Sequence, residues 1–442
     1  MPDPMLPRPP EALAAAGRRV LFVAGNIDTH LKSYLPVIAH LRDARGILSA
    51  VLLLEEPRGL ESESTVLRKA REDGVEILRL PTTSRPAKVL GPLRSIRFAL
   101  RYPRELRAFL RRTAPRLVVT GNDICYPAQC ALRFAAELGI PSLVVEDAVR
   151  EFVKVKRPFG LRARRLLVNV LARGNAIFGA KFHARWGPDV FAVWGEYAAR
   201  YYLASGVARE RVVATGQPRF DAVFTEPWAA PSAALYQRLR VDPEEKRIVF
   251  APNWIMSAAD AEEQVRGTEA LLGAVRAVSA ATGTRCRVIV KLPRVEDNIS
   301  KYYDRLPSEL LDGVITMSSD ELYPLLAGCD LAVTFFSTVG FEAALFGKPL
   351  ITINLSGLPD IVDYAREGIA VGVYSAEGFV DALSRCLFDA ETRERLGRRR
   401  REYLELRCAA SDRLASERVG DLVCSLLSSA GGDPSRAGPP RP

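Results

Sequence analysis

The chain has 442 residues, which is longer than one ordinary hydrophobic core supports, so two or three domains are expected. A composition of 48% hydrophobic and 26% charged residues excludes a disordered or fibrous protein, and no stretch approaches the roughly 18–20 apolar residues of a membrane-spanning helix. The net charge of +10 favours an anionic partner, while the scattered seven cysteines and three histidines indicate neither a disulfide framework nor a metal site.

The N-terminal half begins with a proline-rich stretch over 1–18, which lacks a signal-peptide pattern and is expected to be the disordered tail of a cytoplasmic protein. Apolar runs then alternate with amphipathic stretches. Such alternation predicts a doubly wound parallel sheet, and we expect one Rossmann-like domain over 19–218. Its predicted strands are 19–25, 48–54, 75–80, 117–120, 142–145, 190–194 and 212–215.

The pattern restarts after a connector over 219–246. A second Rossmann-like domain is expected over 247–390, followed by C-terminal helices over 391–428 and a disordered tail over 429–442. The predicted fold class is therefore α/β, with two doubly wound parallel-sheet domains that face a cleft. Neither half has G-x-G-x-x-G after a strand or a P-loop, so dinucleotide and P-loop functions have no support. The strands predicted in this half are 247–252, 287–292, 313–317, 331–336 and 350–353.

The most informative segment runs over 331–349. A short apolar run stops at Ser337 and Thr338, and a helix-like pattern follows through Gly340 and Glu342. A strand, a tight turn and a helix N-terminus leave backbone N–H groups that favour an anion such as a diphosphate. The alternative is that Ser337 caps the helix and Glu342 complements its dipole. A capping box needs Glu three residues after the cap, where Gly340 stands, so a ligand site is favoured.

Three motifs carry a resemblance to a known superfamily: Ser-Thr-x-Gly-x-Glu-Ala-x-x-x-Gly-Lys-Pro at 337–349, Val-Trp-Gly-Glu at 193–196, and the segment 212–221. With two tandem Rossmann-like halves, the chain resembles GT-B glycosyltransferases over residues 115–390. Similar families include bacterial surface-polysaccharide transferases, CDP-glycerol glycerophosphotransferases and, more distantly, UDP-N-acetylglucosamine 2-epimerases. The resemblance implies an N-terminal acceptor domain, a C-terminal nucleotide-donor domain, and transfer without a metal or any cofactor besides the nucleotide-sugar co-substrate.

The resemblance also implies where the nucleotide donor binds. Glu342 would hold the ribose hydroxyls. Ser337, Thr338 and Gly340 would face the diphosphate, and positive charge nearby would stabilise the leaving group. The remaining donor-binding candidates are the interdomain residues Gly216, Gln217 and Pro218, the polar Asn253, and the basic Lys291 and Arg294. For Lys291 the alternative is a solvated strand end.

The sequence departs from the family pattern at two places. Related transferases often carry Lys-x-His-Pro after a strand of the second domain, and here 291–294 is Lys-Leu-Pro-Arg. They also often carry His-Gly after the strand that follows Gly-Ile-Pro, and here Asp147 stands where that histidine would be. The first departure weakens an assignment to the glycerophosphotransferases. The second requires that a base at this place be a carboxylate.

An inverting transfer needs one group to take a proton from the acceptor hydroxyl. The catalytic candidates all follow predicted strands of the N-terminal half: Asp147 first, His30 second, and then Glu146 and Asp123. Because Glu146 and Asp147 are adjacent, their side chains are expected to point in different directions. For His30 the alternative is a polar residue at a helix start that bonds to backbone. A retaining transfer would need no such base.

The positive charge gathers in two segments of the N-terminal half. Residues 85–116 hold ten basic residues and one acid, Glu105, and residues 154–173 hold seven basic residues and no acid. Both mix arginines with apolar residues, as cationic amphipathic segments on an anionic membrane surface do. Solvated helix faces are the alternative. Nucleic acid is not an expected partner, because no recognisable reading motif accompanies the charge.

The sequence therefore predicts a cytoplasmic glycosyltransferase, peripheral on the inner face of the cell membrane. It would move a sugar from a nucleotide-sugar donor to a surface-polysaccharide or lipid-linked acceptor. A sugar-nucleotide 2-epimerase and a CDP-glycerol-type glycerophosphotransferase stay open, although three histidines are few for the epimerase. A further hypothesis is a catalytically silent GT-B module that binds a nucleotide or a partner protein.

Overall fold

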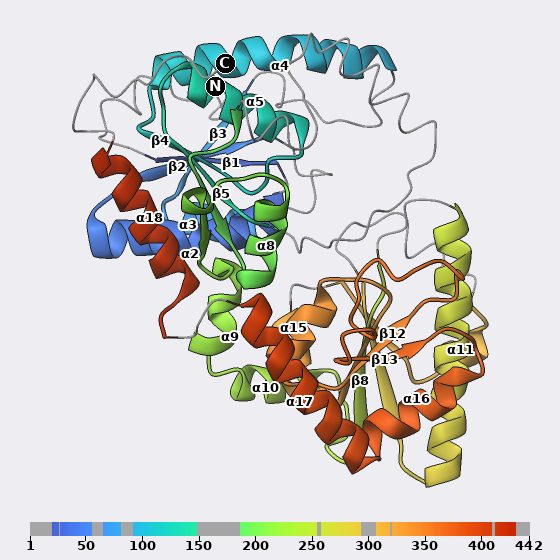
Figure 1. The fold of residues 1–442 in the computed structure, drawn as a ribbon. Helices are drawn as coiled ribbons and strands as arrows, with labels where there is room; N and C mark the ends of the chain where they lie inside the picture. The colour runs from blue at the N-terminus through green and yellow to red at the C-terminus, as the bar shows by residue number, and fades with distance from the viewer. Residues whose placement is uncertain are drawn as a thin grey trace, which may run out of the picture. The chain divides into compact units, whose positions relative to one another are not determined.

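The computed structural model describes residues 20–25, 27–54, 65–80, 92–147, 186–253, 258–292, 306–318, 321–408 and 412–429. The chain forms two compact units (Figure 1). Unit 1 consists of Met1–Asp221 and Arg407–Pro442, and unit 2 of Ala222–Leu406. The predicted tails lie outside the described residues, apart from Ser429.

The described part of unit 1 contains a seven-stranded sheet in the order β3-β2-β1-β4-β5-β6-β7, in which every pair of neighbours is parallel. The predicted parallel sheet is therefore confirmed. Its central strands are buried apolar runs because a parallel sheet is covered on both faces, whereas the edge strand β3 is half-buried and contains Glu76 and Arg79. The strands of this sheet are β1 (Val20–Ala24), β2 (Ser49–Leu53), β3 (Glu76–Arg79), β4 (Leu117–Thr120), β5 (Ser142–Val145), β6 (Val190–Val193) and β7 (Val212–Ala214).

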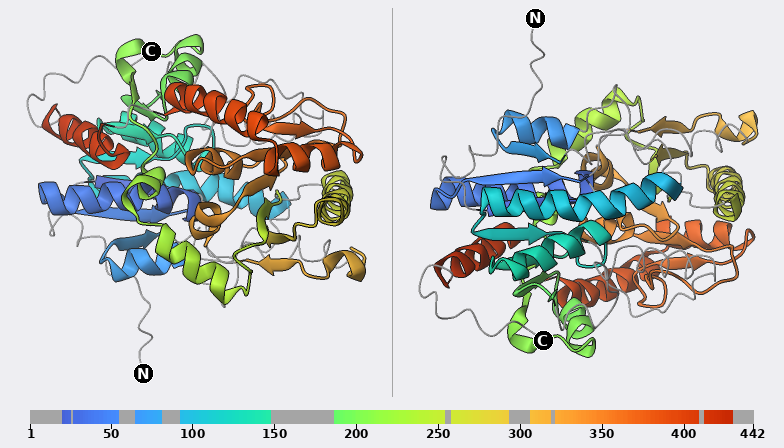
Figure 2. Two further views of the ribbon diagram at one scale, coloured as in Figure 1. Left: turned by 90° about the horizontal axis from the view of Figure 1, so that it is seen from below. Right: turned by 90° about the horizontal axis from the view of Figure 1, so that it is seen from above.

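Helices cover both faces of this sheet (Figures 1 and 2). Alternate residues of β1 point to opposite sides, so that Phe22 packs in one cluster with α2 (Ile27–Arg45) and α18 (Ala415–Ser429), and Leu21 in another with α4 (Pro92–Thr113) and α5 (Tyr126–Glu137). Figure 1 shows α4 along the top of unit 1. The other helices of this unit include α3 (Thr65–Glu72) and α8 (Glu196–Ala204).

The C-terminal helix α18 belongs to unit 1 and packs against α2. Its first turn is capped by Asp221, whose carboxylate accepts the N–H groups of Ala415 at 2.9 Å and Ser416 at 2.8 Å. A carboxylate at a helix start satisfies unpaired amides and complements the dipole. This contact joins the two chain segments of unit 1, because Asp221 ends the first segment and α18 belongs to the second. None of the helices described here is long and apolar enough to cross a membrane.

The described part of unit 2 contains a six-stranded sheet in the order β10-β9-β8-β11-β12-β13, again parallel throughout. Its strands are β8 (Lys246–Ala251), β9 (Cys286–Lys291), β10 (Ile315–Met317), β11 (Leu331–Thr334), β12 (Leu350–Ile353) and β13 (Val371–Val373). Its helices include α10 (Ala229–Arg238), α11 (Ala258–Thr282), α14 (Leu322–Gly328), α15 (Val339–Leu345), α16 (Gly378–Leu387) and α17 (Ala390–Arg407), which ends in unit 1. Residues 219–246 contain the short α9 (Asp221–Thr225) and α10.

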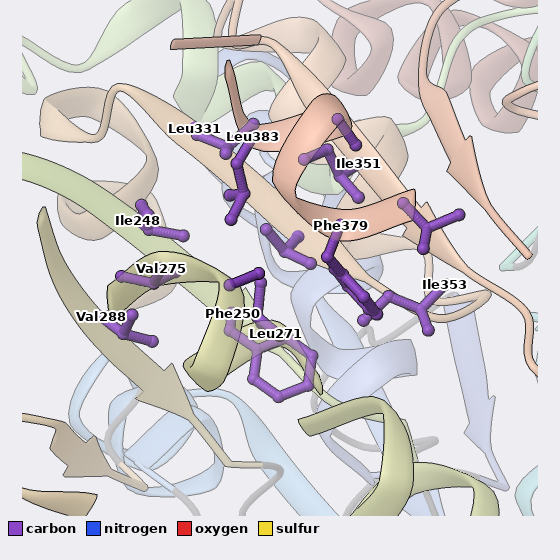
Figure 3. Packing of buried hydrophobic residues seen from close by; sticks show 14 of the residues in the cluster. Ile248, Phe250, Leu271, Val275, Val288, Leu331, Ile351, Ile353, Phe379 and Leu383 are labelled. Carbon is purple, nitrogen blue, oxygen red and sulfur yellow. The ribbon is translucent and has the colours of Figure 1, made fainter. Parts of the chain in front are cut away.

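The main core of unit 2 lies between its sheet and two helices. Leu271 of α11 and Phe379 of α16 pack over Phe250 of β8 and Ile351 of β12 (Figure 3). Each of these four residues is fully buried. The core therefore holds the strands β8, β11 and β12 side by side, which fixes where the turns after these strands emerge.

Candidate active site

The carboxyl edge of the unit 1 sheet brings together polar side chains from three strands. The strand order reverses between β1 and β4, and ligands of open α/β sheets bind at the carboxyl ends of strands beside such a reversal. His30 follows β1 and Asp147 follows β5, and His30 Nε2 lies 2.7 Å from Asp147 Oδ2. We call this arrangement, with Gly121 and Asn122 after β4, the β1–β4–β5 corner.

Two glycines shape this corner. A Cβ atom on Gly121 would lie 2.7 Å from His30 Nε2, closer than real side chains approach, so the imidazole fits against a glycine. The Gly121 carbonyl accepts the Asp147 N–H at 2.9 Å, and Gly25 donates its N–H to His30 Nδ1 at 3.0 Å. The structure thus places the first two base candidates in one hydrogen-bonded pair.

Asn122, which the sequence analysis did not select, completes the corner. Its Oδ1 accepts the N–H groups of Ile124 at 3.3 Å and Cys125 at 3.0 Å, before α5 begins. Its Nδ2 donates to Asp147 Oδ2 at 3.4 Å. Asn favours helix starts because its side chain accepts backbone N–H groups there. An Asn between a predicted strand and a predicted helix is the signal that could have identified it.

Tyr34, on α2, is a further ionisable group near the pair. Its ring centroid lies 5.7 Å from that of His30, and its hydroxyl donates to the Val23 carbonyl at 3.0 Å. Burial, and secondarily the Asp147 carboxylate, raise the pKa of Tyr34 well above its usual value. The phenol therefore keeps its proton and serves as a fixed neutral neighbour.

The other two carboxylate candidates are buried. Glu146 is 1% exposed, and its Oε2 accepts the Trp194 N–H at 3.2 Å on the β6 side. Asp123 is 2% exposed. Adjacent residues after a strand point in opposite directions, which separates Glu146 from Asp147. Neither Glu146 nor Asp123 meets the solvent as Asp147 does, with a side chain that is 15% exposed.

The segment Gly216, Gln217 and Pro218 lies in unit 1, at the end of β7. Gly216 has a φ of +83°, a left-handed conformation that favours glycine. The Gln217 side chain is buried, with Nε2 donating to the Glu146 carbonyl and Oε1 accepting the Arg219 N–H at 3.3 Å. The Nε2 end of Gln217 therefore ties the end of β7 to the end of β5, and the Oε1 end bonds within its own segment. A donor contact of this segment stays a prediction.

In unit 2 the turn between β11 and α15 closes on itself. The Val339 N–H donates to Ser337 Oγ at 3.2 Å and the Gly340 N–H to the Ser337 carbonyl at 3.1 Å. Those of Phe341 and Glu342 donate to the Thr338 carbonyl at 3.0 and 3.1 Å. The expectation of unpaired amides is therefore wrong for these four groups, because the α15 helix is short and its first turn is tight.

An aromatic side chain fills the space beside this turn. A Cβ atom on Gly340 would lie 2.5 Å from the ring of Tyr364, which is fully buried, and the Tyr364 hydroxyl donates to the Ser337 carbonyl at 3.2 Å. Gly340 is therefore a close-packing residue whatever else it does. We call residues 337–342 with Tyr364 the β11–α15 corner. No sequence pattern indicated this ring, which comes from a loop beyond β12.

Glu342 lies at the far side of the same corner. It is 8% exposed, and its Oε1 accepts the Tyr323 hydroxyl at 3.4 Å. The Tyr323 ring lies edge-to-face with Trp228 at 5.5 Å and with Phe346 at 5.4 Å between centroids. Burying a carboxylate costs free energy unless it is hydrogen-bonded. Here the hydrogen bond comes from Tyr323, whose ring is held by two aromatic neighbours. The Glu342 carboxylate is a suitable acceptor for paired hydroxyl groups.

Two further donor candidates end the neighbouring strands. Asn253 follows β8, is 6% exposed, and accepts the Phe336 N–H through Oδ1 at 3.4 Å, which joins it to the turn after β11. Lys291 ends β9, and its Nζ donates to the Leu292 carbonyl at 3.1 Å. Arg294 lies outside the described residues. Over the ranges that the structure describes, no group of three His, Cys, Asp or Glu side chains is placed to hold a metal ion.

Helix α4 lies within the first basic segment, whose residues 85–91 are outside the described residues, as is the whole of the second segment, 154–173. One face of α4 packs in the core of unit 1 through Tyr102, Leu106, Phe109 and Leu110. The opposite face is basic, although Arg107 pairs with Glu137 at 3.0 Å. Its described exposed arginines are Arg101, Arg104, Arg107, Arg111 and Arg112.

The fold of two parallel α/β units is that of the GT-B enzymes, as predicted. It is shared with UDP-GlcNAc 2-epimerase from Neisseria meningitidis bound to UDP-GlcNAc (TM-score 0.63, 15% identity, 92% of this chain and 100% of that chain covered). It is also shared with a variant of the wall teichoic acid polymerase TagF (0.59, 12%, 94% and 90%) and the glycotransferase of kitacinnamycin (0.59, 16%, 92% and 99%). At these identities the likeness establishes the fold alone.

A family model places the chain more narrowly. The model for CDP-glycerol:poly(glycerophosphate) glycerophosphotransferase matches residues 197–425, more than half of the chain. The chain therefore belongs to this family, and the expectation of a GT-B transferase is confirmed. The match includes the β11–α15 corner and leaves the β1–β4–β5 corner outside. Comparison with curated proteins gave no match.

Proposed function

We propose that this transferase moves a sugar from a nucleotide-sugar donor to a hydroxyl group of a surface polysaccharide or of a lipid-linked acceptor. Membership of the glycerophosphotransferase family supports a transfer from a nucleotide-linked donor, because the match over 197–425 includes all the donor-side candidates. The fold shared with a UDP-GlcNAc-bound enzyme and with a wall teichoic acid polymerase supports a nucleotide-linked donor and a cell-envelope product.

In this proposal unit 2 binds the donor nucleotide. Glu342 accepts hydrogen bonds from the ribose hydroxyls through Oε2, since Tyr323 bonds to Oε1. Because the amides of 339–342 are paired, the hydroxyl groups of Ser337 and Thr338 meet the diphosphate instead. Positive charge from Lys291, joined by Arg294, offsets the charge on the leaving group without a bound metal or other cofactor.

Unit 1 binds the acceptor and supplies the base at the β1–β4–β5 corner. The acceptor oxygen loses its proton as it forms a bond to the anomeric carbon of the donor sugar. The bond from that carbon to the diphosphate breaks, and its electron pair stays on the diphosphate oxygen. The products are the glycosylated acceptor, a nucleoside diphosphate and one proton, which the base releases to water.

The family description favours a second candidate, the transfer of glycerol phosphate from CDP-glycerol. In that reaction the acceptor oxygen attacks phosphorus, and the leaving group is CMP. The same base would take the same proton. The two reactions are therefore distinguished by the nucleotide that is released, a diphosphate in the first and a monophosphate in the second.

The test is to incubate the purified chain with UDP-, GDP- and CDP-linked sugars and with CDP-glycerol, with and without a lipid-linked saccharide acceptor. We expect acceptor-dependent release of a nucleoside diphosphate, measured by chromatography. Release of CMP from CDP-glycerol would select the second candidate, and a changed sugar without an acceptor would indicate an epimerase. If no donor is consumed and none raises the melting temperature, the proposed function is wrong.

A variant pair tests the donor site. Glu342→Ala should raise the concentration of donor that gives half of the maximal thermal shift, because the ribose loses its hydrogen-bond acceptor. Glu262→Ala, which removes an exposed carboxylate from α11 in the same unit, is the control and should bind the donor as the unaltered chain does. Equal donor binding by both variants would contradict the assignment.

We further propose that the basic face of α4 holds the enzyme against the anionic inner surface of the cell membrane, where lipid-linked acceptors lie. A basic residue near such a surface contributes about 1 kcal/mol to the binding free energy, so the exposed arginines of this helix can act together.

The double variant Arg104→Glu with Arg111→Glu should reduce sedimentation of the protein with phosphatidylglycerol vesicles. Phosphatidylcholine vesicles are the control. Equal binding to both lipids, or binding that salt does not weaken, would contradict an electrostatic contact.

A further inference from the structure

The hydrogen bonds of the β1–β4–β5 corner have directions that backbone amides fix at both ends. A backbone N–H can only donate. The Gly25 N–H therefore makes His30 Nδ1 an acceptor, and the ring proton of the neutral imidazole must reside on Nε2. Nε2 then donates to Asp147 Oδ2 at 2.7 Å. His30 thus has neither a free lone pair nor a free proton.

The other end of the network is fixed in the same way. Two backbone N–H groups at the start of α5 donate to Asn122 Oδ1, so the amide is oriented with Nδ2 toward Asp147. Asp147 Oδ2 therefore receives two donors, a short one from His30 and a longer one from Asn122 at 3.4 Å. A proton on Oδ2 would point toward the N–H groups of His30 and Asn122 that already donate to this oxygen, and it would weaken both hydrogen bonds.

These directions leave one atom for proton transfer. Among the residues that the structure describes, no group bonds to Asp147 Oδ1, and the Asp147 side chain is 15% exposed, whereas that of His30 is 3% exposed. We propose that Asp147 Oδ1 is the atom that takes the proton from the acceptor, and that His30 and Asn122 are positioning residues that hold the carboxylate. This inference rests on the proposed transferase function and extends it, because it assigns the base.

The proposed step balances as follows. The acceptor O–H bond breaks, its proton moves to Asp147 Oδ1, and the acceptor oxygen bonds to the donor's electrophilic atom. The bond to the leaving nucleotide breaks, and the electron pair remains on the nucleotide phosphate. The protonated carboxyl keeps both hydrogen bonds at Oδ2, so neither His30 nor Asn122 has to move. The proton then leaves from Oδ1 to water.

Gly121 also helps to hold the Asp147 carboxylate in place. The imidazole lies where any other side chain of residue 121 would begin, so the short bond between His30 and Asp147 depends on the missing Cβ atom. The Gly121 carbonyl also holds the Asp147 backbone at 2.9 Å. The carboxylate is thus held from the side chains of two residues and from the backbone of a third.

Three substitutions separate positioning from proton acceptance. His30→Gln keeps an amide N–H that can donate to Asp147, whereas His30→Leu is of similar size and has no donor. We expect His30→Leu to lower kcat about 10²-fold with little change in donor KM, and His30→Gln to recover most of that loss. His40→Gln makes the same substitution ten positions along α2 and should leave kcat unchanged. Equal loss in the Gln and Leu variants would identify His30 as the base and overturn the proposal.

The tautomer is tested without any turnover. In protein labelled with ¹⁵N-histidine, the His30 signals, assigned by their loss in His30→Gln, should show a proton on Nε2 and none on Nδ1. A proton on Nδ1 would overturn the proposal even if the enzyme is active. If the chain transfers nothing from any donor, the proposed function fails, and an Nε2 proton would still support the geometry of the corner.

Discussion

The two corners of the molecule are built on the same plan and use it differently. In each, a turn after a buried strand has a glycine against which an aromatic ring rests, Gly121 with His30 in unit 1 and Gly340 with Tyr364 in unit 2. In unit 1 the His30 ring donates a hydrogen bond to the partly exposed carboxylate of Asp147. In unit 2 the ring bonds back to the turn itself, at the Ser337 carbonyl.

This difference separates a corner that can react from one that can bind. The imidazole joins the Gly25 backbone N–H to Asp147 Oδ2, and in our proposal Asp147 Oδ1 then takes the proton of the acceptor. The phenol of Tyr364 holds a turn whose amides are already paired, so the side chains of Ser337, Thr338 and Glu342 are what the turn offers to a ligand.

The largest effect should come from Asp147→Asn. The amide keeps the shape of the side chain but cannot accept a proton, so the transfer rate should fall about 10²- to 10⁴-fold while donor binding, measured by thermal shift, is retained. Asp43→Asn, at an exposed carboxylate paired with Arg42, is the control and should transfer at the normal rate. A rate within twofold of normal for Asp147→Asn would show that the unit 1 corner is not reactive.

The next effect should come from Gly121→Ala. The new methyl group would meet three atoms of an imidazole ring that is held by two hydrogen bonds and is 2% exposed, so the ring must shift and the bond to Asp147 must lengthen. A displaced catalytic group costs on the order of 10²-fold in rate. We therefore expect a loss of kcat that exceeds any loss of stability, measured on the folded fraction. Unchanged kcat would contradict the role of this glycine.

The described strands of both sheets, except β13, could be predicted from sequence because a buried parallel strand is usually a continuous apolar run. The predicted strands at 19–25 and 331–336, for example, contain β1 and β11. The strand β13 was missed because it has only three residues and Gly372 interrupts its apolar pattern. Parallel strands also have their carboxyl ends at one edge, so the polar residues that follow them could be selected as candidates. His30 and Asp147 were selected in this way, although they are 117 residues apart.

What could not be predicted is how each polar group is satisfied. Gln217 follows β7 as Asp147 follows β5, yet its side chain bonds inside unit 1. The amides after β11 looked like the unpaired start of a helix, yet the turn pairs them. Tyr364 covers Gly340 from a separate loop, and no local pattern specifies such a contact. Hydrogen-bond partners depend on tertiary packing, which the period of apolar residues does not encode.

Within unit 2, Gly340→Ala should act on stability first. The new Cβ atom would lie 2.5 Å from a fully buried ring, and overpacking of this kind costs about 1–3 kcal/mol of unfolding free energy. Gly273→Ala is the control, because this helical glycine has open space and alanine favours helices. If Gly340→Ala weakened donor binding and left the urea unfolding curve unchanged, Gly340 would face the ligand rather than the ring.

The smallest effect should come from Tyr364→Phe, which keeps the ring against Gly340 and removes one hydroxyl. The Ser337 carbonyl would lose the bond from that hydroxyl at 3.2 Å, but it still accepts the Gly340 N–H at 3.1 Å. A hydrogen bond of this kind contributes about 1 kcal/mol, so the unfolding free energy should fall by about that amount. His30→Leu removes the matching ring contact in unit 1 and should lower kcat far more than it lowers stability. If Tyr364→Phe instead abolished transfer at unchanged stability, the covering ring of unit 2 would have a catalytic part, and the two corners would not differ in kind.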